Sequence, residues 1–446
     1  MTRRTMHEDP KWKELVVILK KVIGMEAALR DGDTFMNTIH AIYYLFSGKE
    51  AYSKFIDIPS MLSSLPVEVV DQFLSVSFPV MCSDVENMSP IGVLPFLHAD
   101  ISGLISFTPL EAYYLLICCF LCIPLSDDGV ANFSTTCHLF FTNRPRICSK
   151  LHCLLNYFNV IVASKTTDFG LKILLDRSVR LERLVESKLH GAEWWMSRTD
   201  ALLSPVCVQS AFVPIESLCN ALHANFANKH IGGGVLRRGC VQEEIRMMIA
   251  PELVLGVILA DPIGDNESVV ISGTVQFNKY SGYATSFKCL GLSPRILNDQ
   301  QPIQTDTVVC MDAIPFGLEK NLQYHLPLIV RELEKCRIAL AHTDGGPSAF
   351  ATGNWGCGVF GGDPQLKFVI QWLAASMCGR PLWFCPFDDT NTVSLIQRLY
   401  NEVANRKISV GHLFSLLVEG IDQIANQGTI QVLLERVCSH TSEASV

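Results

Sequence analysis

Residues 230–246 are His230-Ile-Gly232-Gly233-Gly234-Val-Leu-Arg-Arg-Gly-Cys-Val-Gln242-Glu243-Glu244-Ile-Arg. Three consecutive glycines carry no Cβ, so the backbone can approach a ligand closely. The spacing after residue 241 predicts a helix, whose free N–H groups suit a phosphate or a carboxylate. Helical neighbours point about 100° apart, so Glu243 and Glu244 are expected to have different tasks. Taken alone, the pattern also fits a glycine-rich turn followed by acidic residues that favour a helix N-terminus.

A second glycine-rich segment, residues 351–364, reads ATGNWGCGVFGGDP. Its final Asp-Pro is typical of a helix start, which predicts a loop that surrounds a ligand with backbone amides. Residues 356–361 also match the dinucleotide pattern G-x-G-x-x-G. The acidic partner of that pattern should follow about 20 residues later, whereas Asp388 and Asp389 stand 27 and 28 residues after Gly361. A nicotinamide-dependent oxidoreductase therefore stays a minor alternative.

Aromatic residues follow two predicted strands. Tyr280 and Tyr283 lie in a loop, where either ring could close over a ligand or pack on the core. Tyr283 follows a glycine and is the better candidate for closing over a ligand, whereas Tyr280 is expected to pack on the core surface. Phe387 ends another strand and could stack on a base, or it could belong to the core.

Composition excludes several classes of protein. The 446 residues carry 36 Lys+Arg against 44 Asp+Glu, a net charge of −8, so no basic excess favours sequence-specific nucleic-acid binding. The longest apolar run, Ala112–Leu125, is shorter than the roughly 20 residues of a membrane span and predicts a buried helix. The N-terminus shows no secretory signal, and seventeen scattered cysteines favour a reducing compartment with mostly free thiols.

No metal site is expected. Cys119 and Cys122 have C-x-x-C spacing inside the apolar helix, with no second pair to match. Cys137-His138 and His152-Cys153 match no common zinc spacing.

The pattern of predicted helices and strands divides the chain into two regions. Residues 1–200 are predicted to be mostly helical, including a helix over residues 171–190, and Thr108-Pro-Leu-Glu111 has the form of a capping box. Residues 201–446 alternate β-rich and helical stretches, which predicts a three-layer α/β fold with a largely parallel or mixed sheet between helices. Strands are expected at 206–208, 268–276, 307–312, 337–342 and 381–385. Helices are expected at 241–249, 322–334, 364–376, 392–404 and 410–425.

The two glycine motifs, in this order and with the segment Tyr280-Ser-Gly-Tyr283 between them, resemble the signature of the poly(ADP-ribose) glycohydrolases. The resemblance is strong over residues 215–419, faint over 105–200 and absent over the first 95 or so. It implies a macrodomain at residues 201–446 and a helical accessory or regulatory region at 1–200. It also implies a hydrolase that releases ADP-ribose from poly(ADP-ribose) and from poly(ADP-ribosyl)ated proteins, without a cofactor or metal. We expect a monomer in the nucleus or cytoplasm that does not bind membranes. We also expect it to act in the DNA damage response.

The resemblance also implies roles for individual residues. Glu244 would be the catalytic acid/base, and Glu243 would hold the ribose at the scissile bond together with Asn228. Tyr283 would close over the ligand, Phe387 would pack on the adenosine, and the second glycine loop would line the phosphates. The implied ligand contacts are Gln242, Asn228, Asn225, Gly232, Gly233, Gly234, Tyr283, Asn354, Gly356, Cys357, Gly358, Val359, Phe360, Gly361, Phe387, Ile215 and Glu216.

Two points stay open at this stage. The helix N-terminus favours the carboxylate form of Glu244, while the adjacent Glu243 and the ligand's diphosphate favour its proton. Asn225 stands where the family usually has Asp. That departure leaves a catalytically weak module that binds ADP-ribose as the alternative to an active enzyme.

Overall fold

The computed structural model describes residues 9–87, 94–125, 141–166, 172–297, 303–341 and 349–439. Cys137 and His138 lie outside these ranges. Among the described residues, no helix is long and apolar enough to cross a bilayer, and fifteen cysteines carry free thiols.

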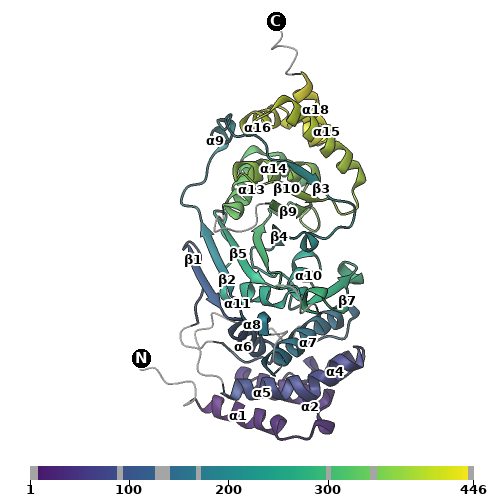
Figure 1. Cartoon of the computed structure of the whole chain (residues 1–446). Coiled ribbons are helices and arrows are strands. Elements are labelled where there is room, and N and C mark those ends of the chain that lie inside the picture. Colours follow the sequence, from purple (N-terminus) through teal and green to yellow (C-terminus); the bar gives the residue numbers. More distant parts are fainter. Residues whose placement is uncertain are drawn as a thin grey trace.

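The N-terminal region is mainly helical and occupies one end of the molecule (Figure 1). Thr108 Oγ1 accepts the Glu111 N–H at 3.2 Å while Glu111 Oε2 accepts the Thr108 N–H at 2.7 Å, so the predicted capping box starts a buried helix. The helices are α1 (Pro10–Ile23), α2 (Gly32–Ser47), α3 (Ile58–Ser63), α4 (Val67–Gln72), α5 (Phe78–Asn87), α6 (Pro109–Phe120), α7 (Pro145–Thr166) and α8 (Lys172–Leu175).

Eight strands form one mixed sheet in the order β1-β2-β5-β8-β4-β9-β10-β3. The pairs from β8 to β3 are parallel, and the pairs from β1 to β8 are antiparallel. The strands are β1 (Gly103–Phe107), β2 (Val179–Val185), β3 (Val206–Val208), β4 (Ala221–Ala227), β5 (Glu267–Thr274), β8 (Asp306–Asp312), β9 (Ala349–Gly353) and β10 (Leu382–Cys385). A separate hairpin pairs β6 (Asn278–Ser281) with β7 (Lys288–Leu292).

The sheet lies between two helical layers, as predicted. In β5, Val269 and Ile271 belong to one buried cluster and Val270 to the other, because successive side chains of a strand point to opposite faces. The N-terminal helices share the first cluster with α10 (Gln242–Ile249), α11 (Leu255–Leu259) and α12 (Pro294–Leu297). The second face is covered by α9 (Ala192–Met196), α13 (Leu326–Leu340), α14 (Pro364–Met377), α15 (Thr390–Arg406), α16 (Val410–Glu419), α17 (Ile421–Gln427) and α18 (Thr429–Ser439).

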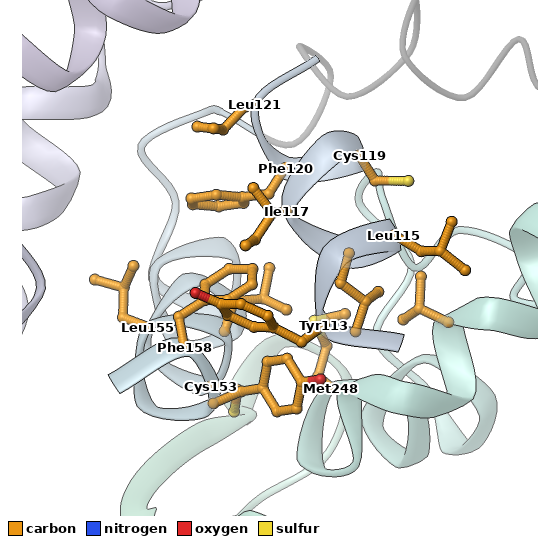
Figure 2. Close-up of a cluster of buried hydrophobic side chains, with 14 of the residues drawn as sticks. Tyr113, Leu115, Ile117, Cys119, Phe120, Leu121, Cys153, Leu155, Phe158 and Met248 are labelled. Atoms are coloured by element: carbon orange, nitrogen blue, oxygen red, sulfur yellow. The ribbon is translucent and has the colours of Figure 1, made fainter. Parts of the chain in front are cut away.

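The helical region and the sheet are joined by a continuous apolar core. Tyr113 and Phe120 of α6 and Phe158 of α7 pack together, and Met248 of α10 lies beside this cluster (Figure 2). The ring centroids of Phe120 and Phe158 are 5.0 Å apart. Helix α10, which carries the two adjacent glutamates, therefore packs against the N-terminal helices.

Two predicted elements are wrong. Residues 179–185 form strand β2 and not a helix, because burial alternates along the segment and the buried Arg183 pairs with the buried Glu267 of β5. Residues 337–340 are the last turn of α13 and not a strand, since Leu333, Cys336 and Leu340 pack on one helical face. β1 and β2 thus lie N-terminal to the boundary predicted near residue 200, although they belong to the sheet.

Candidate active site

The candidate residues meet at one edge of the sheet. The neighbouring parallel strands β8, β4, β9 and β10 have their carboxyl ends at this edge, where ligands of α/β sheets usually bind. The glycine-rich segment before α10 follows β4, the second glycine loop follows β9, and Phe387 follows β10.

Glu243 is enclosed by donors from β4 and from the first glycine motif. Its Oε1 accepts hydrogen bonds from Asn225 Nδ2 at 3.1 Å and from the Gly232 N–H at 2.7 Å. Its Oε2 accepts the Asn228 N–H at 3.0 Å. Burial raises the pKa of Glu243 to about 8 and the nearby Glu244 adds to this shift, although the three donors oppose it. Burial therefore shifts the Glu243 carboxyl group toward its protonated form.

Glu244 is bound by a different pair of main-chain donors. Its Oε1 accepts the Gly234 N–H at 2.9 Å, and its Oε2 accepts the Val241 N–H at 2.8 Å. The two glutamates thus share no donor. The N–H groups of Gly232 and Gly234, which lie in the segment predicted to approach a ligand closely, bind the protein's own glutamate side chains.

Glycines are required here because the carboxylates lie against the backbone. A Cβ on Gly239 would stand 2.5 Å from Glu244 Oε1, and one on Gly233 would stand 2.9 Å from the same oxygen. Gly233 also has a φ of +48°, which side chains disfavour. Any larger residue at either position would displace the carboxylate of Glu244.

Lys150 reaches this loop from the helical region. It lies on α7, is fully buried, and donates from Nζ to the carbonyl oxygens of Val235 at 2.9 Å, Arg237 at 3.2 Å and Gly234 at 3.4 Å. Burial lowers the pKa of Lys150 to about 8, while the charge of Glu244 acts in the opposite direction. An ammonium group of the N-terminal region therefore holds the loop whose Gly234 N–H binds Glu244. Lys150 could not be recognised from the sequence, because nothing in its local sequence marks it.

The second glycine loop presents unused donors. Among the described residues, the main-chain N–H groups of Gly358, Val359 and Phe360 donate to no acceptor, and Val359 is 85% exposed. Successive free N–H groups are a common way to bind an anion, and these three lie shortly before the N-terminus of α14. The positive φ of Gly356, +74°, turns the chain where a Cβ would meet Ala313 at 2.7 Å. The loop has the donors that a diphosphate requires.

A polar network lies behind Ile215 and Glu216, which the family resemblance places beside the adenine of the ligand. Ile215 and Glu216 form a buried 3-10 turn before β4. Tyr280 packs on the core, as expected, and its hydroxyl also donates to Glu216 Oε1 at 2.6 Å. Arg295 donates to the Glu216 carbonyl oxygen at 2.7 Å and pairs with Asp306 at 2.8 Å. Tyr280 and Arg295 therefore fix the orientation of Glu216, which the sequence alone did not reveal.

Some predicted ligand residues have internal partners. The amide of Gln242 bridges the main chain of β4, with Oε1 accepting the Phe226 N–H at 2.8 Å and Nε2 donating to the Ala224 carbonyl at 2.9 Å. Asn354 Nδ2 donates to the Pro386 carbonyl at 3.2 Å. Cys357 Sγ donates to the Trp355 carbonyl at 3.5 Å. These side chains shape the loops around the predicted ligand.

Asn225 carries one unused polar atom. Its Nδ2 donates to Glu243, whereas its Oδ1 accepts no hydrogen bond among the described residues, although it is buried.

No group of three or more His, Cys, Asp or Glu side chains suited to a metal ion occurs in the described ranges.

The raised pKa of Glu243 predicts how stability depends on pH. The folded protein keeps the Glu243 proton up to a pH of about 8, whereas an unfolded chain loses it near its ordinary value of 4.5. Between these values the folded state binds more protons, so the contribution of Glu243 to the free energy of unfolding falls as pH rises. Glu243→Gln should remove this fall, and urea unfolding from pH 4 to 9 measures it. If the free energy of unfolding changes with pH in the same way for the wild type and for Glu243→Gln, the raised pKa of Glu243 is contradicted. Glu193→Gln, at an exposed carboxylate, is the matched control.

The fold and site together define a macrodomain in which α10, the helix that carries the two glutamates, packs against a helical domain. One family model, described as poly(ADP-ribose) glycohydrolase, Macro domain fold, matches residues 192–394, and a second, described as the helical domain of the same enzymes, matches residues 66–176. The similarity thus begins at residue 66, so the expectation of none over the first 95 or so residues is wrong for residues 66–95. The chain belongs to the poly(ADP-ribose) glycohydrolase family.

Similar proteins occur in a plant and in a nematode. The chain is 27% identical to poly(ADP-ribose) glycohydrolase 1 of Arabidopsis thaliana over 401 residues, which cover 73% of this chain and 71% of the plant protein. It is 30% identical to the probable poly(ADP-ribose) glycohydrolase 2 of that plant, covering 68% of this chain and 67% of that protein. It is also 30% identical to poly(ADP-ribose) glycohydrolase 2 of Caenorhabditis elegans, covering 63% of this chain and 61% of the nematode protein.

Proposed function

We propose that the protein hydrolyses the ribose–ribose O-glycosidic bonds of poly(ADP-ribose) and releases ADP-ribose. The observation that carries this proposal is the pairing of two features at neighbouring strand ends. Glu243 and Glu244 are held separately by main-chain donors after β4, and a row of unused N–H groups follows β9. The first feature suits a glycosidic centre and the second suits a diphosphate. Family membership supports the same substrate.

The proposed reaction uses Glu244 twice. Glu244 donates a proton to the 2′-oxygen of the leaving ribose as the bond from that oxygen to C1″ breaks. It then takes a proton from the water that attacks C1″, so that the products are ADP-ribose and a shortened chain with a free 2′-hydroxyl. Glu243 and Asn228 would hold the ribose, and the second glycine loop would hold the diphosphate.

The basic test is turnover by the purified protein. Poly(ADP-ribose) incubated with the enzyme and EDTA, with no nicotinamide cofactor, should yield mainly free ADP-ribose. Polymer that stays intact over hours at micromolar enzyme would contradict the proposal.

A catalytically weak module that binds ADP-ribose is the second candidate. Asn225 favours it, because an amide stands beside Glu243 where the resemblance implies a carboxylate. Calorimetry with ADP-ribose and a turnover assay on the same sample separate the two functions. Binding without turnover would favour the module.

The ring of Tyr283 supplies a further prediction. It is 41% exposed, and its hydroxyl lies near the main chain of Gln242 and the carboxylate of Glu244. Tyr283→Ala should weaken ADP-ribose binding by about 1–3 kcal/mol, the value of one stacking aromatic, and should lower kcat because the ribose is held less precisely. Titration and initial rates measure both effects. Tyr283→Phe keeps the ring and should retain most of the affinity, and equal losses in the two variants would show that the hydroxyl and not the ring binds the ligand.

The remaining expectations are also proposals. We also predict that the protein acts on poly(ADP-ribosyl)ated proteins and lies in the nucleus or cytoplasm. We further predict a role in the DNA damage response and a monomeric state.

A further inference from the structure

A buried lysine lies against the base of the second glycine loop. Lys367 is on α14 and is 1% exposed. Its Nζ atom would be 3.2 Å from a Cβ on Gly356, and its Cε atom would be 3.0 Å from a Cβ on Gly362. These two glycines close the base of the loop, because the Gly362 N–H donates to the Gly356 carbonyl oxygen at 2.9 Å. The end of the lysine side chain therefore supports the segment that carries the unused N–H groups.

Two aromatic rings and one carboxylate surround the Lys367 ammonium group. Its Nζ atom lies 4.4 Å from the ring centroid of Trp355 and 5.8 Å from that of Phe316, distances at which a ring attracts a cation. It also pairs with the buried Glu332 of α13. Phe316 is itself bound to the loop, because its N–H donates to the Phe360 carbonyl oxygen at 2.9 Å. The ammonium group is thus enclosed between the loop and α13.

This ion pair belongs to a larger group of charged side chains. Asp312 pairs with Arg331 at 2.7 Å and with Lys335 at 2.8 Å, and Arg331 also pairs with Glu332 at 3.1 Å. Lys335 is as deeply buried as Lys367, but its other partners are carbonyl oxygens at and just before the start of β5. Two equally buried lysines of one group therefore have different surroundings.

Stability alone does not account for a buried ion pair at this place. Removing two charges from water costs about as much free energy as their attraction returns, and apolar side chains of similar volume often serve as well. Burial and the Arg331 guanidinium group lower the pKa of Lys367 well below its usual range, while Asp312 opposes this shift. An anion bound to the loop would favour the ammonium form in the same way as Asp312. A lysine at the base of the loop thus suits an anionic ligand.

We propose that Lys367 is a positioning residue that strengthens binding of the ligand's diphosphate by the second glycine loop. Since it is buried, it acts without contacting the ligand. It holds the base of the loop and adds a positive charge to the segment that carries the N–H groups of residues 358–360. This inference rests on the proposed function, because it takes ADP-ribose as the ligand. Lys150 and Lys367 then support different parts of the site, the first the loop of the glutamates and the second the loop of the diphosphate.

The test compares Lys367→Met with Lys335→Met in the full chain. Lys367→Met keeps most of the stem and removes the charge, so the Kd for ADP-ribose should rise about tenfold, the order expected for one charge acting through protein. The kcat on saturating poly(ADP-ribose) should stay within about threefold of the wild type, because a lost binding contribution raises KM and not the rate of the bound substrate. Lys335→Met should lower the melting temperature and leave the Kd within about twofold, because the attraction between charges falls with distance. Calorimetry, initial rates and thermal unfolding measure these quantities.

A double variant separates the charge from the packing. Lys367→Met leaves Glu332 buried without its ammonium partner, which destabilises the fold. Lys367→Met combined with Glu332→Gln removes both charges and should recover most of the melting temperature. The Kd for ADP-ribose should nevertheless stay at least about threefold above that of the wild type, because the ammonium group is the charge that lies against the loop.

The remaining outcomes would overturn the inference. Full recovery of ADP-ribose affinity in the double variant, or an equal loss of affinity in Lys335→Met, would show that Lys367 only maintains the fold. A fall in kcat larger than the change in Kd would contradict a role in diphosphate binding. Each of these results leaves the proposed function intact if the wild type binds ADP-ribose and degrades the polymer. Failure of the wild type to bind ADP-ribose would overturn both.

Discussion

Glu244→Gln is expected to lower kcat by about 10³-fold or more. Proton transfer by a positioned side chain contributes roughly 10²–10⁴-fold to such reactions, and the amide keeps the shape of the side chain but cannot supply a proton. ADP-ribose binding should stay within about tenfold of the wild type, because the substitution leaves the second glycine loop unchanged. Single-turnover rates and calorimetry on one preparation measure the two quantities.

A structural cost must be separated from this chemical effect. Both oxygens of Glu244 accept main-chain N–H groups, so the amide nitrogen of Gln would face one donor without a partner. An unmade buried hydrogen bond costs about 1–3 kcal/mol, and the melting temperature reports that loss. Turnover retained within tenfold would show that Glu244 does not transfer the proton. A loss of both turnover and ADP-ribose binding, in step with unfolding, would show that the variant reports only on stability.

Lys150→Met is expected to lower kcat about 100-fold while ADP-ribose binding changes less than threefold. The substitution removes the ammonium group that binds three loop carbonyls and so releases the segment from Gly234 to Arg237. Since Gly234 donates to Glu244, the carboxyl group that we propose as the acid/base should move with the loop. A misplacement of about 1 Å at the reacting centre costs on the order of 10²-fold in rate.

The same helix offers a matched control for Lys150. Lys165, also on α7, pairs with Asp84 of α5. Lys165→Met should lower the melting temperature without a selective loss of kcat, because Lys165 is not bonded to the loop. Equal kinetic effects in the two variants would show that Lys150 contributes only to helix packing. A loss of ADP-ribose affinity as large as the loss of kcat would contradict the positioning role.

The sequence predicted those features that depend on local patterns. The capping box of Thr108 and Glu111, the helix that carries Glu243 and Glu244, and the strand at 206–208 agree with the structure. Glycine spacing, capping residues and apolar periodicity act over a few residues, so they can be recognised without the fold. The family resemblance rests on such local motifs.

The central strands of the sheet could not be recognised in this way. β4 and β9 read ALHANFA and AFATG, and nearly all of their residues are buried. A strand covered on both faces shows no alternation of polar and apolar residues, so its period is hidden. β2 was misread for a related reason, because the buried Arg183 appears exposed until its partner Glu267 is known.

The sequence by itself determined which residues we propose for the chemistry, namely the adjacent glutamates and the two glycine loops, because glycine and carboxylate spacing is a property of the chain. Only the tertiary structure decided which distant residues hold the glutamates and the loops in position. Lys150 is 84 residues from Gly234 in sequence, and Tyr280 is 64 residues from Glu216. Phe212 meets Phe387 through the parallel pairing of β3 with β10. These contacts form because strand order and helix packing bring distant segments together, and no local pattern encodes that order.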